Sequence, residues 1–203
     1  MTPLRELQLV EAHRDGDGEA MGELLQAYQP RIYAVCYRML GNVEEARDIT
    51  QDSMVRVIEG LNSYDGRAQL STWVIRVTMN CCLSSLRRKR LRRHQPLEVA
   101  PEPQSRDRIG SGRELQPGAG VERSEMSKQV HEVLARLDPQ TRGLLILRDI
   151  QELSYQQVAE VLEVPLGTVK SRVFRARLAF REDFGAMWGE EPHRQRPGNQ
   201  EAS

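Results

Sequence analysis

Residues 168–181 combine hydroxyl and basic side chains in the way that a helix in contact with nucleic acid requires. Apolar residues recur in this segment at spacings of four, three and four, which puts them on one stripe of a helix: Val169, Val173, Ala176 and Phe180. The other faces carry side chains that can donate hydrogen bonds to phosphates and to base edges: Thr168, Lys170, Ser171, Arg172, Arg175, Arg177 and Arg181. The pattern predicts a helix that packs on an apolar core and presents a DNA-binding face.

Another helix is predicted directly before this one, over 154–162. It opens with a capping box, in which Ser154 can cap the third helical amide and Gln157 can reach back. The break that follows, EVPLG, contains Pro165, whose fixed φ suits the first turn of a helix. Two short helices with a tight turn, the second of them basic, are typical of a DNA-reading helix-turn-helix. The alternative is an ordinary helical hairpin with a solvated basic face, but cap, break, apolar stripe and basic face occur together.

A second basic cluster ends the helix predicted over 70–93. Its last residues, RRKRLRR, include six basic side chains among 87–93. A narrow polar stripe of Arg76, Asn80 and Arg87 runs between two apolar stripes, which we expect to be buried between neighbouring helices. The apolar stripes are Leu70, Trp73, Val74, Val77 and Cys81 on one face, and Ile75, Met79, Cys82 and Leu86 on another. Such a helix suits nucleic acid, because each phosphate contact steepens the salt dependence of binding by about one unit.

Residue types that could do catalytic or metal chemistry are present, but without the spacing that such chemistry needs. Asp48 and Asp52 lie one helical turn apart and could form a carboxylate pair, yet no candidate nucleophile accompanies them. The sequence contains no Gly-rich phosphate loop, nucleophile elbow or metal-ligand spacing. Its three cysteines and four histidines share no ligand spacing. We therefore expect no enzymatic activity, no cofactor and no bound metal.

The order of the motifs predicts an all-α protein, with two small helical domains joined by a flexible linker and a helix-turn-helix in the C-terminal domain. We expect the first domain at 1–93, the linker at 94–124, the second domain at 125–184 and a disordered tail at 185–203. Four prolines, four glycines and mixed charges leave the linker too little apolar surface to offset its ordering entropy. The elements expected are 4–14, 19–40 with an interruption at Pro30, 43–61, 70–93, 124–137, a buried segment at 142–150, 154–162 and 168–181.

The overall charge limits how this chain can bind nucleic acid. It contains 29 Lys and Arg residues and 29 Asp and Glu residues, whereas a protein that binds naked DNA by bulk electrostatics is usually basic throughout. Contacts with nucleic acid must therefore come from local basic patches or from a partner that shares the binding. The chain has neither an apolar signal core nor a membrane-length apolar run, so we expect a cytoplasmic protein without membrane insertion.

The C-terminal segment 137–182 resembles the promoter −35-binding domain of extracytoplasmic-function (ECF) sigma factors, members of the sigma-70 superfamily. Its sequence is LDPQTRGLLILRDIQELSYQQVAEVLEVPLGTVKSRVFRARLAFRE. One departure is Glu163, where the family commonly has glycine; a left-handed residue there would cost Glu about 1 kcal/mol more than Gly. The resemblance implies contacts with −35 DNA by Pro165, Gly167, Thr168, Lys170, Ser171, Arg172, Arg175 and Arg177.

The earlier segment 46–90 resembles the −10-binding domain of the same family. Its sequence is ARDITQDSMVRVIEGLNSYDGRAQLSTWVIRVTMNCCLSSLRRKR, and its main departure is Ser84, where the family often has Asp. The resemblance implies a pocket in the loop 62–69 for a base flipped out of the −10 element, with Trp73 either in the core or in that pocket. The implied polymerase contacts are Asp48, Gln51, Asp52 and Arg56. The implied −10 contacts are Asn62, Tyr64, Asp65, Arg67, Arg76, Asn80, Arg87, Arg88 and Arg90.

Taken together, the two segments imply a non-catalytic sigma factor. Its partners would be core RNA polymerase, through the β′ clamp and the β flap, and promoter DNA, whose −10 and −35 elements it recognises and whose melting it promotes. An anti-sigma factor is a partner that the family commonly has and that the sequence leaves open for this chain. The rival interpretation is an autonomous helix-turn-helix regulator with an unrelated helical sensor domain, which would bind paired half-sites tightly without polymerase.

Overall fold

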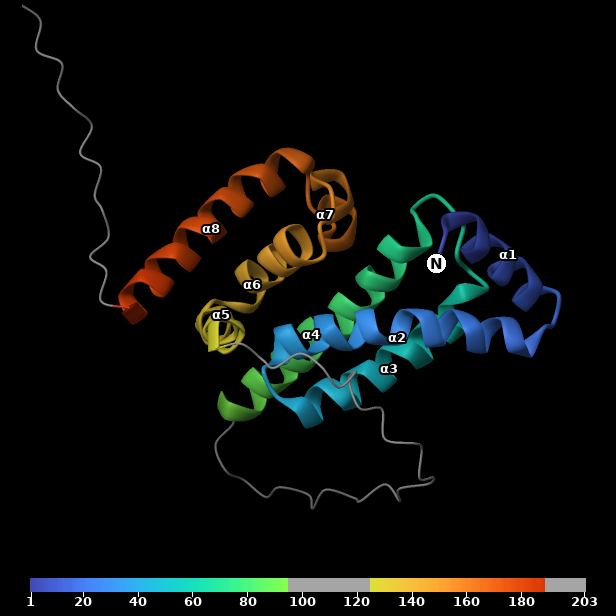
Figure 1. Cartoon of the computed structure of the whole chain (residues 1–203), viewed down its shortest axis with the longest axis horizontal. Coiled ribbons are helices and arrows are strands. Elements are labelled where there is room, and N and C mark those ends of the chain that lie inside the picture. Colours follow the sequence, from blue (N-terminus) through green and yellow to red (C-terminus); the bar gives the residue numbers. More distant parts are fainter. Residues whose placement is uncertain (95–124, 189–203) are drawn as a thin grey trace, which may run out of the picture.

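Every regular element in the computed structural model is helical within the residues that it describes, 1–94 and 125–188 (Figure 1). The first range contains α1 (Pro3–Arg14), α2 (Gly18–Leu40), α3 (Val43–Leu61) and α4 (Leu70–His94). The second contains α5 (Glu125–Arg136), α6 (Pro139–Leu145), the π-helical segment η1 (Ile146–Ile150), α7 (Tyr155–Leu162) and α8 (Leu166–Trp188). The predicted all-α class is confirmed. The expected linker lies outside the described residues, apart from His94 at the end of α4.

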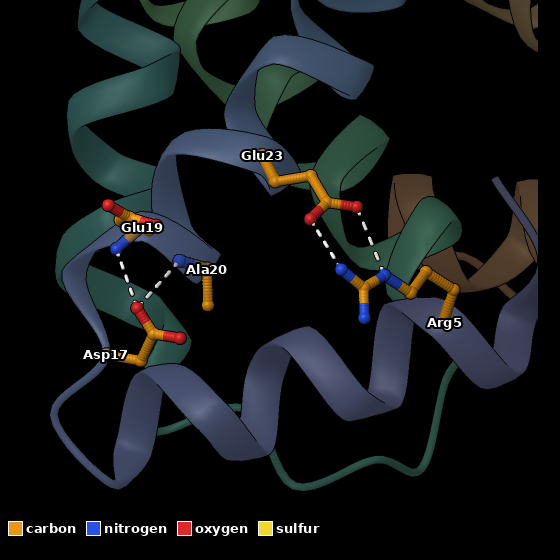
Figure 2. Close-up of polar contacts among 5 residues, drawn as sticks. All are labelled: Arg5, Asp17, Glu19, Ala20 and Glu23. Carbon is orange, nitrogen blue, oxygen red and sulfur yellow. Dashed lines mark hydrogen bonds and ion pairs between the residues drawn. The ribbon is translucent and has the colours of Figure 1, made fainter.

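A helical hairpin is formed by α1 and α2, and two sets of polar contacts define it (Figure 2). Asp17 caps α2, since its Oδ1 accepts hydrogen bonds from the amides of Glu19 at 2.8 Å and Ala20 at 3.3 Å. Across the hairpin, Arg5 Nε donates to Glu23 Oε1 at 3.1 Å and Arg5 Nη2 donates to Oε2 at 2.6 Å. These hydrogen bonds lower the pKa of Glu23. Because both side chains are about half exposed, the pair orients the two helices more than it stabilises the fold.

The long helix α2 continues through Pro30, so the predicted interruption there is wrong. An interior proline removes one backbone hydrogen bond and crowds the preceding turn. On either side of Pro30, however, α2 buries large side chains such as Tyr28 and Ile32 against the other helices, and this packing outweighs the local loss. The predicted end of the helix is confirmed: Gly41 has a left-handed φ of 76°, and Asn42 caps α3.

Helix α4 contacts helices of both units (Figure 1). It packs against α2 and α3 and also against α6 and α7. The two predicted apolar stripes are covered, as expected: Leu70, Val74, Ile75, Met79, Cys81 and Cys82 are buried, and Trp73, Val77 and Leu86 are partly buried. Part of that cover comes from the second unit.

Direct packing of the second unit on the first creates one continuous apolar core. A Cβ added to Gly143 would lie 2.8 Å from Met79 Cε, so the backbone of α6 rests on α4. The rings of Tyr37 on α2 and His131 on α5 stack with their centroids 4.8 Å apart. Docking of the two units was not predicted, because residue patterns predict individual elements and not which faces of two units meet.

A buried arginine joins the two units. Arg142 of α6 is 7% exposed, and its guanidinium donates to the Met39 carbonyl near the end of α2. It also donates to the carbonyls of Ala135 at 2.7 Å and Leu137 at 3.0 Å within its own unit. Burial lowers the pKa of Arg142, and the nearby Asp138 carboxylate opposes that shift. The charged guanidinium of Arg142 thus donates hydrogen bonds to carbonyl groups at helix ends in both units.

The last helix, α8, is longer than predicted. It continues to Trp188, so residues 185–188 of the expected disordered tail are helical. The rings of Phe180 and Phe184 stack with centroids 5.8 Å apart, one helical turn from each other, and support this extension. The remainder of the expected tail, 189–203, lies outside the described residues.

Candidate nucleic-acid interface

The helix-turn-helix consists of α7 and α8, and local hydrogen bonds define its first helix. Ser154 N donates to Gln157 Oε1 at 2.8 Å and Gln157 N donates to Ser154 Oγ at 3.2 Å, so the predicted capping box is confirmed. At the other end, Glu163 has a left-handed backbone, with φ 55° and ψ 43°. The amide of Val164 donates to the Ala159 carbonyl at 3.1 Å and closes the turn. Glu163 thus adopts a conformation that favours glycine.

The helix α8 buries one side and exposes the other. The predicted apolar stripe is confirmed, with Val169, Val173 and Ala176 buried and Phe180 partly buried. The opposite face presents Lys170, Ser171 and Arg175 to solvent within two helical turns, a length that can enter the major groove. The other residues expected around the turn lie at the N-terminal end of this helix: Pro165, Gly167 and Thr168.

An exposed aromatic residue on this face was missed by the sequence interpretation. Phe174 is 71% exposed and shares the face with Lys170 and Ser171, from which it is separated by four and three residues. An apolar side chain in the major groove can contact the C5-methyl group of thymine. The signal was available, because Phe174 falls outside the apolar stripe of its own helix.

Two of the expected −35 contacts lie at the edges of the exposed face. Arg177 Nε donates to Asp149 Oδ2 at 3.1 Å, and this hydrogen bond raises the pKa of Arg177. Arg172 is half-buried and lines a groove between the units together with Met79 and Leu83 of α4. The centre of the exposed face is therefore formed by Lys170, Ser171 and Arg175. The contact between Arg177 and Asp149 also joins α8 to η1.

The polar stripe of α4 is exposed as predicted. Its members, with the basic residues that follow, are Arg76, Asn80, Arg87, Arg88 and Arg90. They form a row of hydrogen-bond donors along the helix, which suits the phosphates and bases of an extended strand. At the beginning of the row, Arg76 also forms an ion pair with Glu163 of the second unit.

The loop before α4 differs from expectation at Tyr64, which is only 6% exposed. Its hydroxyl donates to the Ala68 carbonyl, its ring lies 5.5 Å from that of Trp73, and its own carbonyl accepts a hydrogen bond from Arg14. Burial raises the pKa of Tyr64. The Tyr64 side chain therefore packs inside the loop, and its contact with −10 DNA stays a prediction.

The remaining loop residues are accessible. Asn62, Asp65 and Arg67 are exposed, and Arg67 Nε lies 3.2 Å from Asp65 Oδ2. Trp73 is partly buried against Gly60, where an added Cβ would lie 2.9 Å from the indole, so Trp73 belongs mainly to the core. Across an open groove of about 350 Å³, the loop faces α7.

A further exposed face belongs to α3 and carries the four expected polymerase contacts, Asp48, Gln51, Asp52 and Arg56. Two exposed apolar residues extend it, Val55 at 52% and Ile58 at 38%. An exposed face that combines acidic and apolar side chains is typical of a protein-binding surface.

Among the described residues, no cluster of three or more His, Cys, Asp or Glu side chains could hold a metal ion. None of the helices in these two ranges is both long and apolar enough to cross a membrane. The buried thiols of Cys36 and Cys82 lie 3.7 Å apart between α2 and α4, and Cys81 is also buried.

Both halves of the chain match known sequence families. The family described as Sigma-70 region 2 matches residues 24–92, and the one described as Sigma-70, region 4 matches residues 127–180. A solved structure with the same fold is the sigma factor RpoE from Bartonella quintana, determined in complex with the anti-sigma factor NepR. It has a TM-score of 0.58 and 23% identity, and the likeness covers 80% of this chain and 94% of that chain.

Curated relatives extend the match to nearly the whole chain. The ECF RNA polymerase sigma factor SigW of Bacillus subtilis is 33% identical over 174 residues, which cover 84% of this chain and 92% of SigW. The RNA polymerase sigma-H factor of Pseudomonas aeruginosa is 29% identical over 180 residues, which cover 88% of this chain and 93% of that protein. With the helix-turn-helix and the basic helix α4 in their expected positions, this chain belongs to the ECF RNA polymerase sigma factors, which act in transcription initiation.

Proposed function

We propose that the first unit binds core RNA polymerase and the −10 strand of promoter DNA, while the second unit reads the −35 duplex. The protein would act in the cytoplasm without catalysing a reaction itself. The observation that carries this proposal is the presence of two separate donor-rich surfaces in one chain, on α4 and on α8. An autonomous helix-turn-helix regulator needs only the second of them.

For the −35 element, the exposed face of α8 supplies three kinds of contact. Lys170 and Arg175 carry charges for phosphates and for the acceptor atoms of guanine, Ser171 carries a small donor, and Phe174 can contact thymine. Arg175 is the residue best suited to bidentate base contact, because its guanidinium is exposed on the same face of α8 as Lys170 and Ser171. Contact of this unit with the β flap of the polymerase is part of the same proposal.

For the −10 element, the loop and α4 suit a single strand that has left the duplex. Extracting a base costs a few kcal/mol, which stacking and edge hydrogen bonds in a shaped pocket can offset. The exposed loop residues Asn62, Asp65 and Arg67 offer donors and acceptors for base edges. The arginines at the end of α4 would neutralise the phosphates of the same strand.

For core polymerase, the exposed face of α3 is the proposed contact with the β′ clamp. Asp48, Gln51 and Asp52 would meet basic or polar groups, and the apolar Val55 and Ile58 would be buried on binding. Complete burial of an exposed apolar side chain contributes about 1.5–3 kcal/mol, and these two side chains, already partly covered, would each contribute a part of that. This apolar pair gives the surface a source of affinity that does not depend on salt.

Run-off transcription with core polymerase and a matched promoter tests the proposal. The purified protein should stimulate specific initiation, and failure to do so across candidate promoters would refute it. A gel shift on duplex DNA without polymerase separates the rival, since the neutral chain should bind weakly alone. An anti-sigma factor remains a proposed partner, and co-purification from the native cell is the experiment that would detect it.

A further inference from the structure

The first helix of the helix-turn-helix lies on the surface that we propose for the −10 strand. Gln157 Nε2 donates to Gln69 Oε1 at 3.1 Å and to Thr72 Oγ1 at 3.0 Å. One turn further along α4, Arg76 forms its ion pair with Glu163. Gln69 ends the −10 loop and Arg76 begins the polar stripe, so part of the proposed −10 surface is already engaged by the second unit.

Both side chains that make these contacts also have a structural role in α7. Gln157 uses Oε1 in the capping box and Nε2 in the contact with α4, so its whole amide is engaged. Glu163 ends α7 in a left-handed conformation that is strained for any residue with a Cβ. Such strain persists only where surrounding contacts compensate for it, and it often marks a functional position. The pairing with Arg76 is a contact that glycine could not make.

A buried interface lies beneath these polar contacts. Gly143 lets the backbone of α6 rest on Met79, which is one helical turn from Arg76. Arg142, buried beside Gly143, donates to the end of α2. The Arg76–Glu163 pair is therefore the exposed rim of a packed interface and not an isolated surface pair.

From this juxtaposition we propose that Glu163 and Gln157 form a latch that holds the helix-turn-helix against α4 and masks Arg76 in the unbound chain. The proposal rests on the proposed function, because masking matters only if Arg76 contacts the −10 strand. A guanidinium that is paired with Glu163 is not available to a DNA phosphate, and the Glu163 carboxylate repels that phosphate. Binding of the strand thus requires the latch to open.

Fluorescence anisotropy of the full chain with a single-stranded −10 oligonucleotide, without polymerase, tests the latch. Glu163→Gln removes the charge and keeps the size of the side chain. An exposed ion pair shifts an equilibrium by up to about fivefold, so the variant should bind about two- to fivefold more tightly. Glu182→Gln removes the same charge from an exposed position on α8 and should leave the affinity unchanged. An equal gain in both variants would overturn the proposal.

A double-mutant cycle separates the latch from general repulsion of DNA. Arg76→Gln removes the partner of Glu163, so adding Glu163→Gln to that variant should give no further gain. If Glu163→Gln tightens binding by the same factor with and without Arg76, Glu163 acts on the DNA directly and the latch is refuted.

A DNA-independent measurement distinguishes failure of the latch from failure of the proposed function. Spin labels at Gln8→Cys on α1 and Ala186→Cys on α8 occupy exposed positions, whereas the native cysteines are buried. We expect one distance in the otherwise unchanged chain and added longer distances after Glu163→Gln. An identical distribution in both would overturn the latch. If Glu163→Gln adds longer distances but the protein gives no run-off transcription, the proposed function is refuted. The latch would then remain only as a contact that holds the two units together.

Discussion

Replacement of Arg142 by alanine removes the charged donor from three carbonyl groups, those of Met39, Ala135 and Leu137. A hydrogen bond to a charged group contributes about 1.5–3 kcal/mol. The sum of three such hydrogen bonds would overestimate the loss of stability. Water can enter the space that the side chain leaves, and the variant no longer has to bury a guanidinium. A buried acceptor left without its donor costs about 1–3 kcal/mol, and we expect Arg142→Ala to lower the free energy of unfolding by about 3 kcal/mol in total.

Urea unfolding followed by circular dichroism measures this loss. Arg142→Met keeps most of the side-chain volume but leaves the same carbonyls without their donor, so it should lose nearly as much as alanine. Arg136→Ala is the control, because Arg136 is an exposed arginine on the neighbouring α5 and should change stability by less than about 0.5 kcal/mol. A loss below about 1 kcal/mol for Arg142→Ala would refute the reasoning, and full stability of Arg142→Met would show that volume and not hydrogen bonding matters.

Three further predictions concern the proposed surfaces and the start of α6. Arg175→Ala should weaken −35 binding by about 1–3 kcal/mol in a gel shift with holoenzyme and leave binding to core polymerase intact, with Arg136→Ala at an exposed position on α5 as control. Replacing Asp48 and Gln51 by alanine should reduce co-elution with core polymerase and spare the α8 surface; unchanged association would remove both from the interface. Asp138→Ala should cost about 1 kcal/mol at neutral pH, since Asp138 Oδ1 caps α6. Partial burial acts to raise the pKa of Asp138, but hydrogen bonds from Thr141 and Gln140 together with the charge of Arg142 lower it overall. The stabilisation by Asp138 is therefore present above about pH 4 and is lost as the pH falls through the lowered pKa. Asp138→Asn should not show this loss in acid unfolding.

Local sequence signals predicted the helix-turn-helix correctly because each of them acts over a few residues. The capping box joins Ser154 to Gln157, and the apolar spacing of α8 fixes its buried side from Val169 onward. The same holds for the exposed polar stripe of α4, whose period alone separates Arg76 from the buried positions. Such signals also carry the family resemblance.

Predictions failed where a long-range contact outweighed a local preference. Pro30 should break a helix by its own chemistry, but tertiary packing holds α2 together across it. The burial of Tyr64 was not predicted, because it depends on the Trp73 ring and on a hydrogen bond from Arg14 to the Tyr64 carbonyl, neither of which is a local contact. The ion pair of Arg177 with Asp149 of η1 was also not predicted, and the contact of Arg177 with −35 DNA stays a prediction.

The sequence by itself determined most of the helices and the basic faces, because period, caps and charge are properties of short segments, and the resemblance of two segments to the sigma factor family came from the sequence as well. Only the tertiary structure decided how the two units meet. Glu163 and Arg76 lie 87 positions apart, and Arg142 reaches a carbonyl 103 positions away. No local pattern encodes such pairs, since they depend on which faces remain apolar after each unit has folded and on which of these faces fit one another.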